Sequence, residues 1–164
     1  MTVDAEQFKA GLARWASGVT IVTARAGDRV HGMTVSAFSS VSLDPPLVLV
    51  CADKTSNTLP VIEDAGCFAA NVLARGQEEL SNRFASEEDE WRRFEGLEVE
   101  SGATGAPLIV DALANIDCKV VASHDAGDHV IYVGQVEQIV TRDREPLLFY
   151  QGRYCSVAPE APGG

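Results

Sequence analysis

The side chains best suited to bind a ligand lie within one stretch of the chain, residues 32–58, GMTVSAFSSVSLDPPLVLVCADKTSNT. This stretch places eight Ser and Thr hydroxyls, one Lys and one Asn around an apolar run at residues 47–51. The pattern predicts a strand, a turn at Asp44-Pro45-Pro46, a buried strand, and a loop that leads into a helix. Hydroxyls and backbone N–H groups gathered at the start of a helix can form an anion site, typically for phosphate.

The donors are most concentrated at the end of this stretch, in residues 51–58. Lys54 supplies a positive charge, and residues 55–57 supply hydroxyl and amide groups beside the expected helix start. The alternative is that one of these polar side chains only caps the helix. A second hydroxyl-rich segment at residues 34–40 favours the ligand role, because the two strands would lie side by side.

The histidines and the common catalytic motifs offer little other chemistry. No Cys or carboxylate lies at ligand spacing from His31, His124 or His129, so no metal site is predicted. His124 is expected on a strand edge. His129 follows a Gly-Asp turn and could project into the mouth of a cavity, although taken by itself an exposed turn histidine is the better explanation. The chain contains neither the G-x-S-x-G motif of hydrolases nor the G-x-G-x-x-G motif of Rossmann nucleotide sites.

Composition and charge limit the classes of partner. The chain has 164 residues, of which 46% are hydrophobic, and a net charge of −11. This charge disfavours nucleic acid and anionic membranes, since both require a positive face, and no apolar run is long enough to span a bilayer. The polar N-terminus is not a secretory signal. Four widely spaced cysteines without a CxxC pair indicate reduced thiols and a cytoplasmic protein.

Periodicity and turn signals predict a mainly β chain with an antiparallel barrel. Length and composition indicate a single domain, residues 1–164, with an ordered core at about 5–157 and a frayed tail. Gly134 interrupts one expected strand, which indicates a bulge or a close backbone approach. The expected strands cover residues 19–24, 30–41, 47–51, 67–73, 112–123, 129–141 and 146–157. Strands of this number and spacing are typical of a closed or partly closed barrel.

Three short helices are expected beside the strands. The first begins at Asp4, with Gln7 at the capping-box position, and ends at Gly18. The other two cover residues 57–64 and 77–85. The acidic run at residues 87–90, followed by Trp-Arg-Arg-Phe, is interpreted as a solvated turn with an aromatic anchor.

Taken in order, these motifs resemble the short-chain flavin reductases that serve two-component flavin-dependent monooxygenases, proteins of the FMN-binding split-barrel type. The resemblance spans nearly all of residues 8–157. It is carried by WASGVTIVTA, HGMTVSAFSSVSLDPPLVLVCADKTSNT, FAANVL, LSNRFA, GDHVIYVGQV and GRYCSV. The resemblance implies an antiparallel Greek-key split β-barrel with a few short flanking helices. It also implies a homodimer with flavin near the dimer interface.

The resemblance further implies which residues bind the cofactors. His129, in the Gly-Asp-His turn, would contact the nicotinamide dinucleotide, and Tyr154 would help to close that side. The flavin residues fall into a ring region, a ribityl and phosphate region, and a group of weaker candidates. They are, in this order, Thr34, Val35, Ser36 and Ala37; Cys51, Ala52, Asp53, Lys54, Ser56 and Asn57; and Ser40, Arg83 and Phe84.

The implied activity is reduction of FMN or FAD by NADH or NADPH, with the reduced flavin passing to a partner monooxygenase. The cofactors carry the hydride chemistry, so no side chain is required as a general acid, and the protein contributes by orientation. The choices of flavin, of dinucleotide and of partner stay open. A second class is a split-barrel carrier or sensor of flavin or haem without dinucleotide turnover, against which the Gly-Asp-His turn argues. A relative of the pyridoxamine-phosphate oxidases would need more than one Lys at the phosphate.

Overall fold

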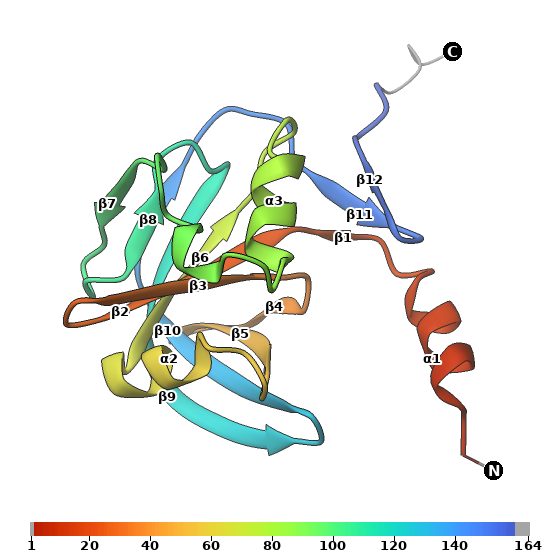
Figure 1. Cartoon of the computed structure of the whole chain (residues 1–164), viewed down its shortest axis with the longest axis horizontal. Coiled ribbons are helices and arrows are strands. Elements are labelled where there is room, and N and C mark those ends of the chain that lie inside the picture. Colours follow the sequence, from red (N-terminus) through yellow and green to blue (C-terminus); the bar gives the residue numbers. More distant parts are fainter. Residues whose placement is uncertain (1, 160–164) are drawn as a thin grey trace.

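Seven antiparallel strands form one curled sheet at the centre of the computed structural model, which describes residues 2–159 (Figure 1). The order across the sheet is β3-β2-β6-β9-β10-β5-β4. The strands are β2 (Thr20–Ala26), β3 (Arg29–Val35), β4 (Phe38–Leu43), β5 (Pro46–Asp53), β6 (Cys67–Val72), β9 (Ala114–Ala126) and β10 (His129–Thr141). The prediction of a mainly β fold with antiparallel sheets and three short helices is confirmed. The predicted frayed tail lies almost entirely outside the described residues.

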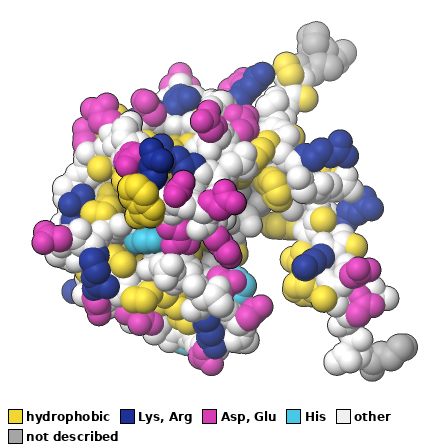
Figure 2. Space-filling view, in the orientation of Figure 1, with side chains coloured by type: hydrophobic (Ala, Val, Ile, Leu, Met, Phe, Trp, Pro, Cys, Tyr) yellow, Lys and Arg dark blue, Asp and Glu magenta, His cyan; other side chains and the backbone are white. Residues whose placement is uncertain are grey.

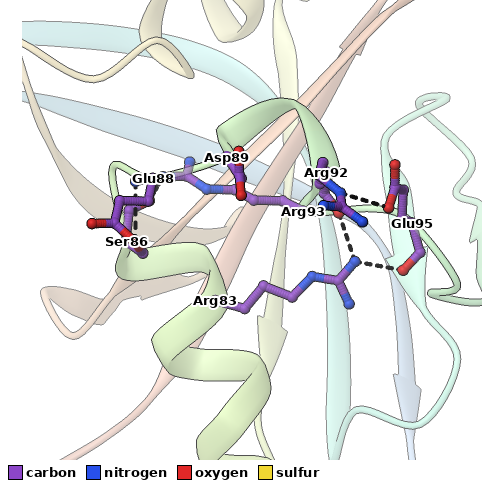
Figure 3. A pocket seen from close by; sticks show the side chains of 7 residues that line it. All are labelled: Arg83, Ser86, Glu88, Asp89, Arg92, Arg93 and Glu95. Carbon is purple, nitrogen blue, oxygen red and sulfur yellow. Dashed lines mark hydrogen bonds and ion pairs between the residues drawn. The ribbon is translucent and has the colours of Figure 1, made fainter.

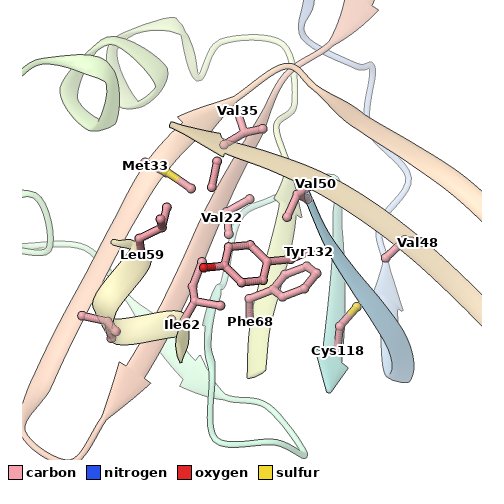
Figure 4. Close-up of a cluster of buried hydrophobic side chains, with 13 residues drawn as sticks. Val22, Met33, Val35, Val48, Val50, Leu59, Ile62, Phe68, Cys118 and Tyr132 are labelled. Carbon is pink, nitrogen blue, oxygen red and sulfur yellow. The ribbon is translucent and has the colours of Figure 1, made fainter. Parts of the chain in front are cut away.

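The sheet curls because its two edge strands are neighbours in the chain. β3 and β4 are joined by Ser36 and Ala37, although they lie at opposite ends of the strand order. Inward-facing side chains of β3 and β5, such as Met33 and Val50, therefore meet in one core cluster with Phe68 of β6 (Figure 4). Burial of this cluster is the main force that holds the barrel closed.

Gly134 in β10 confirms the predicted bulge and close approach. The pairing of β10 with β9 shifts register between Val133 and Gly134. A Cβ atom on Gly134 would lie 2.7 Å from both the Phe68 Cζ and the Cys118 Cβ atoms. Because Phe68 and Cys118 are fully buried, a side chain at this position has no room.

Short elements surround the barrel (Figure 1). The helices are α1 (Ala5–Leu12), α2 (Leu59–Ala65), α3 (Glu78–Ala85) and the 3-10 helix η1 (Glu90–Arg92). The remaining strands are β1 (Ser17–Gly18), β7 (Val99–Ser101), β8 (Pro107–Ile109), β11 (Leu148–Tyr150) and β12 (Arg153–Cys155). Strands β1, β11 and β12 form a separate small sheet. No helix among the described residues is long and apolar enough to cross a membrane.

Helix α1 has the predicted start but ends earlier than predicted. Asp4 and Gln7 form the capping box, and the helix ends at Leu12, well before Gly18. The helix projects away from the barrel in Figure 1, and it has no buried residue. Its apolar residue Phe8 is 61% exposed, and Trp15 just beyond its end is 76% exposed. An apolar surface of this kind indicates a contact with another chain or a ligand.

Two expected strands are each divided in the structure. The segment 30–41 is not one strand, since β3 and β4 separate at Ser36 and Ala37 and pair at opposite edges of the sheet. The segment 146–157 is a hairpin of β11 and β12, because Gln151 and Gly152 both adopt positive φ and reverse the chain. At residues 36–37 no Gly or Pro marks the break, whereas Gly152 is a local turn signal that the prediction of a single strand did not use.

The turn expected around residues 87–94 is less solvated than predicted. Trp91 is 76% exposed and does not anchor the segment, whereas Arg93 is buried. The aromatic anchor is Phe94, whose ring packs edge-on against Phe84 at 5.1 Å between centroids. This segment is therefore fixed to the barrel by a buried arginine and a phenylalanine pair.

Candidate cofactor site

A groove of about 730 Å³ lies between α1 and the outer face of the barrel. Three of the predicted flavin residues line it, namely Ser36, Ala37 and Cys51. Along β5 the side chains alternate in burial, so that Leu49 and Cys51 face the groove while Val50 faces the core. Burial raises the pKa of the Cys51 thiol, which therefore stays protonated and packs as a small apolar group.

The groove carries hydrogen-bond donors as well as apolar surface. Within residues 2–159, the backbone N–H groups of Ser36 and Ala37 donate to no protein acceptor. These two residues are exposed and lie at the seam between the edge strands of the barrel. Free N–H groups beside an apolar wall of Leu49 and Phe38 suit a flat ring with a polar edge, which is the shape of an isoalloxazine. The residues present thus fit a flavin.

Lys54, Asp53 and His129 meet at one end of the same sheet face. His129 stands directly opposite Asp53 in the pairing of β10 with β5, two residues along from Cys51. The Lys54 N–H donates to the Asp128 carbonyl at 3.0 Å, and Lys54 Nζ donates to the Gly127 carbonyl at 2.7 Å. The fold thereby places the predicted phosphate lysine beside the predicted dinucleotide histidine.

The charges at this end are largely paired within the protein. Lys54 forms an ion pair with Asp125, and His129 Nδ1 lies 2.7 Å from Asp128 Oδ1. The hydrogen bond with His129 lowers the pKa of Asp128, so this carboxylate stays ionised. Acidic side chains are spread over the face shown in Figure 2, in line with the net charge of −11. A phosphate that binds Lys54 therefore has to share this ammonium group with the carboxylate of Asp125 and the carbonyl of Gly127.

Residues 55–58 form a turn before α2 rather than a side-chain cap. Thr58 is the N-cap, and its side chain makes no capping bond. The Thr58 N–H donates to Ser56 Oγ at 3.2 Å, and that hydroxyl also lies 3.2 Å from Met33 Sδ. Asn57 Nδ2 donates to Glu90 Oε2 at 2.8 Å. Asp53 accepts from the hydroxyl and the N–H of Thr55, and these two bonds lower its pKa.

The remaining candidates lie apart from the groove or turn their side chains elsewhere. Val35 and Ala52 are buried in the barrel core, so their side chains do not face the groove, and Ser40 is exposed beyond it. Thr34 Oγ1 donates to the Ser81 carbonyl at 2.6 Å, and the Tyr154 hydroxyl lies 2.9 Å from Ser81 Oγ.

Arg83 and Phe84 serve the fold around α3. The Arg83 guanidinium donates to the backbone carbonyls of Arg92 and Glu95 at a separate cavity (Figure 3). Phe84 is 1% exposed and packs against Phe94. Both side chains are thus engaged within the protein.

Comparison with known proteins identifies the family of this chain. Residues 12–158 match the family described as "Flavin reductase like domain". The chain belongs to this family. It is 43% identical over 160 residues to an NADH-dependent flavin reductase of Rhodococcus sp, which covers 92% of this chain and 85% of that protein. It is 42% identical over 150 residues to the reductase component of 4-hydroxyphenylacetate 3-monooxygenase of Thermus thermophilus, covering 91% of this chain and 94% of that protein.

A solved structure of the flavin reductase family agrees closely with this fold. It is an NADH:FAD oxidoreductase of Streptomyces globisporus, solved in complex with NAD and FAD fragments. The TM-score is 0.89 at 35% sequence identity, and the alignment covers 99% of each chain. The predicted resemblance to flavin reductases is confirmed.

Several groove residues of this flavin reductase chain were not predicted from the sequence. Phe38, Ser39 and Leu49 lie within residues 32–58, here called the Ser-rich block. Alternation along β5 could have indicated Leu49, which lies between the buried Val48 and Val50, but it could not have indicated both of the consecutive residues Phe38 and Ser39. Trp15 and Phe149 come from distant segments that only the tertiary fold brings to the groove. No local pattern identifies such residues.

His31, the residue directly before the Ser-rich block, has a lowered pKa. Burial and the nearby positive charge of Arg93 lower the pKa of His31 below its usual 6.5, although Glu90 opposes the shift. His31 Nδ1 lies 2.7 Å from Thr58 Oγ1 and Nε2 lies 3.2 Å from Glu90 Oε2, so neutral imidazole can accept from Thr58 and donate to Glu90.

We expect this histidine to make the folded state sensitive to acid. The unfolded chain takes up the proton first, near pH 6.5, because the folded pKa is lower. The contribution of His31 to stability is therefore complete above pH 6.5 and is lost as the pH falls through the folded pKa. Urea unfolding at several pH values between about 7.5 and 5.5 should show this loss, and His31→Gln should reduce the slope. An equal slope in the variant would assign the loss to other groups.

Proposed function

We propose that this protein is a flavin reductase that transfers hydride from NADH or NADPH to FMN or FAD and supplies reduced flavin to a partner monooxygenase. The observation that carries the proposal is the groove with the free N–H groups of Ser36 and Ala37, on the same sheet face as His129. Family membership and the close likeness to named reductases support the same activity. The flavin, when bound, supplies the hydride-accepting chemistry.

The chain contributes binding and orientation. The N–H groups of Ser36 and Ala37 would donate to the polar edge of the flavin ring, and Leu49 and Cys51 would pack against its apolar part. Lys54, Ser56 and Asn57 would hold the ribityl phosphate. Donors fixed by the backbone need no rearrangement when negative charge develops on the ring, so they stabilise it efficiently.

His129 and Tyr154 would hold the dinucleotide on the open side of the flavin. The imidazole of His129 is half-buried and is oriented by Asp128, so its other nitrogen can contact a ligand. The Tyr154 hydroxyl is held by Ser81 and Asn82. Placing the two reacting rings in contact is the main source of acceleration in this arrangement.

We also propose that a second copy of the chain completes the site. One wall of the groove is α1, which projects from the barrel and leaves Phe8, Leu12 and Trp15 exposed. A homodimer that covers these residues would remove the apolar surface from water. Analytical ultracentrifugation should therefore give the mass of a dimer. The four free cysteines are in keeping with a cytoplasmic enzyme.

The reductase activity can be tested by following NADH and NADPH absorbance with purified protein. Oxidation should require added FMN or FAD, and comparison of both flavins with both dinucleotides should define the preferred pair. A protein that binds flavin but never oxidises either dinucleotide would be a carrier, and this outcome would refute the proposed reductase activity.

Replacing His129 should separate dinucleotide binding from flavin binding. We expect His129→Ala to raise the KM for the dinucleotide about tenfold, or ~1.4 kcal/mol, and to change the KM for flavin much less. The reason is that His129 lies at the hairpin turn rather than in the groove. Steady-state kinetics with each substrate varied in turn gives both values, and His129→Gln should recover part of the loss. Equal rises in both KM values would contradict the assigned role.

A further inference from the structure

A cluster of polar side chains outside the groove connects three segments of the chain. Glu90 of η1 presents its Oε2 atom to Asn57 Nδ2 at 2.8 Å and to His31 Nε2 at 3.2 Å. Its other oxygen, Oε1, lies 3.1 Å from the guanidinium of Arg93. The carboxylate thus links β3, the turn before α2, and η1.

Arg93 fixes this carboxylate firmly. It is 4% exposed, and it donates to the Gly32 carbonyl at 2.7 Å and to the Ser86 carbonyl. Its Nε atom is the one buried side-chain N or O atom without a hydrogen-bond partner in residues 2–159. The guanidinium therefore has little freedom to move, and the Glu90 carboxylate paired with it is held in one place.

The ion pair also changes the charge that Asn57 experiences. The hydrogen bond from Asn57, with the charge of Arg93, lowers the pKa of Glu90, so the side chain is ionised at neutral pH. A bare carboxylate so close to Asn57 would repel a phosphate. Arg93 pairs with the Glu90 carboxylate and offsets its charge, while the carboxylate remains a strong acceptor for Asn57.

The bond to Glu90 leaves part of the Asn57 amide available. Within residues 2–159, the Asn57 side chain has no protein hydrogen bond besides the one to Glu90, although the amide has two N–H groups and an oxygen. The bond restricts rotation of this exposed side chain, so its free N–H keeps one direction. Holding a donor in place before the ligand arrives removes part of the entropy cost of binding.

We propose that Glu90, anchored by Arg93, is a positioning residue that holds Asn57 ready to donate to the flavin phosphate. This proposal rests on the proposed function, in which residues 54–57 bind that phosphate. It predicts that the effect of Glu90 depends on the phosphate itself. The affinity for riboflavin, which has the same ring and no phosphate, should therefore hardly change when Glu90 is replaced.

The test measures dissociation constants of FMN and riboflavin by quenching of flavin fluorescence. We expect Glu90→Gln to weaken FMN binding about tenfold and riboflavin binding less than twofold. Asn57→Ala should give the same pattern, and the double variant should be hardly weaker than either single one, because both act through one contact. Glu95→Gln is the matched control, since Glu95 pairs with Arg92 on the surface and does not contact Asn57.

The outcomes separate the two proposals. Equal weakening of FMN and riboflavin, or none, would overturn the positioning role while leaving the reductase intact. Wild-type protein that binds neither flavin would overturn the proposed function itself. Should Glu90→Gln fail to fold, as judged by circular dichroism, Glu90→Asp, which keeps the charge for Arg93 but draws the carboxylate back from Asn57, decides the question through the same FMN-to-riboflavin ratio.

Discussion

Gly134→Val should lower the free energy of unfolding by about 3 kcal/mol or more. Even the first added carbon would lie 2.7 Å from Phe68 Cζ and from Cys118 Cβ, and both residues are fully buried, Cys118 on the adjacent strand β9 and Phe68 on β6. The strands cannot separate to make room without breaking the β9–β10 pairing that runs through the bulge. Urea unfolding followed by circular dichroism measures the difference directly.

Gly18→Ala is the matched control for this change. A Cβ atom on Gly18 would have no heavy atom within 4 Å, and Gly18 does not have a positive φ. The free energy of unfolding should therefore change by less than about 0.5 kcal/mol. If Gly134→Val unfolds at the same urea concentration as the control, then the barrel can expand at the bulge, and the close packing inferred for this position is wrong.

Ala37→Phe should weaken flavin binding at least tenfold, or by ~1.4 kcal/mol, while the protein stays folded. Ala37 is exposed at the seam of the barrel and lines the groove, so a phenyl ring can be added there without entering the core. The ring would occupy space that the flavin needs beside the free N–H groups. Fluorescence titration with FMN and with riboflavin should show similar losses, because the ring region is common to both.

Ala103→Phe tests whether any added phenyl ring has this effect. Ala103 is exposed in the connection between β7 and β8, away from the groove, and flavin binding should not change. Unaltered flavin affinity in Ala37→Phe would mean that flavin binds outside the groove. A loss confined to FMN would place Ala37 near the phosphate rather than the ring.

Local signals in the sequence were sufficient for much of the fold. The capping box of Asp4 and Gln7, the left-handed Gly66 that ends α2, and the bulge at Gly134 depend on a few neighbouring residues. The alternation that separates Val50 from Cys51 is equally local. The Ser-rich block could be recognised as a binding segment because small hydroxyls accumulate beside a buried strand.

The rest depends on contacts between distant segments. No neighbour of Lys54 in the sequence indicates an ion-pair partner, but the fold pairs it with Asp125 on another hairpin. Arg93 lies in an acidic, polar stretch that is typical of a solvated surface, yet it is buried against Gly32. Phe149 reaches the groove only because β11 pairs with β1. Such partners cannot be assigned from spacing along the chain.

The strand order also determines when this molecule can assemble during synthesis. Hairpins β2–β3 and β4–β5 join neighbouring segments and can form early, but no strand pairing connects one with the other until β9 and β10 fill the middle of the sheet. Pairing between distant segments is slow because long loops must close first. A nascent chain that stops before Ala114 therefore carries nearly all the polar residues of the site, without the sheet that arranges them.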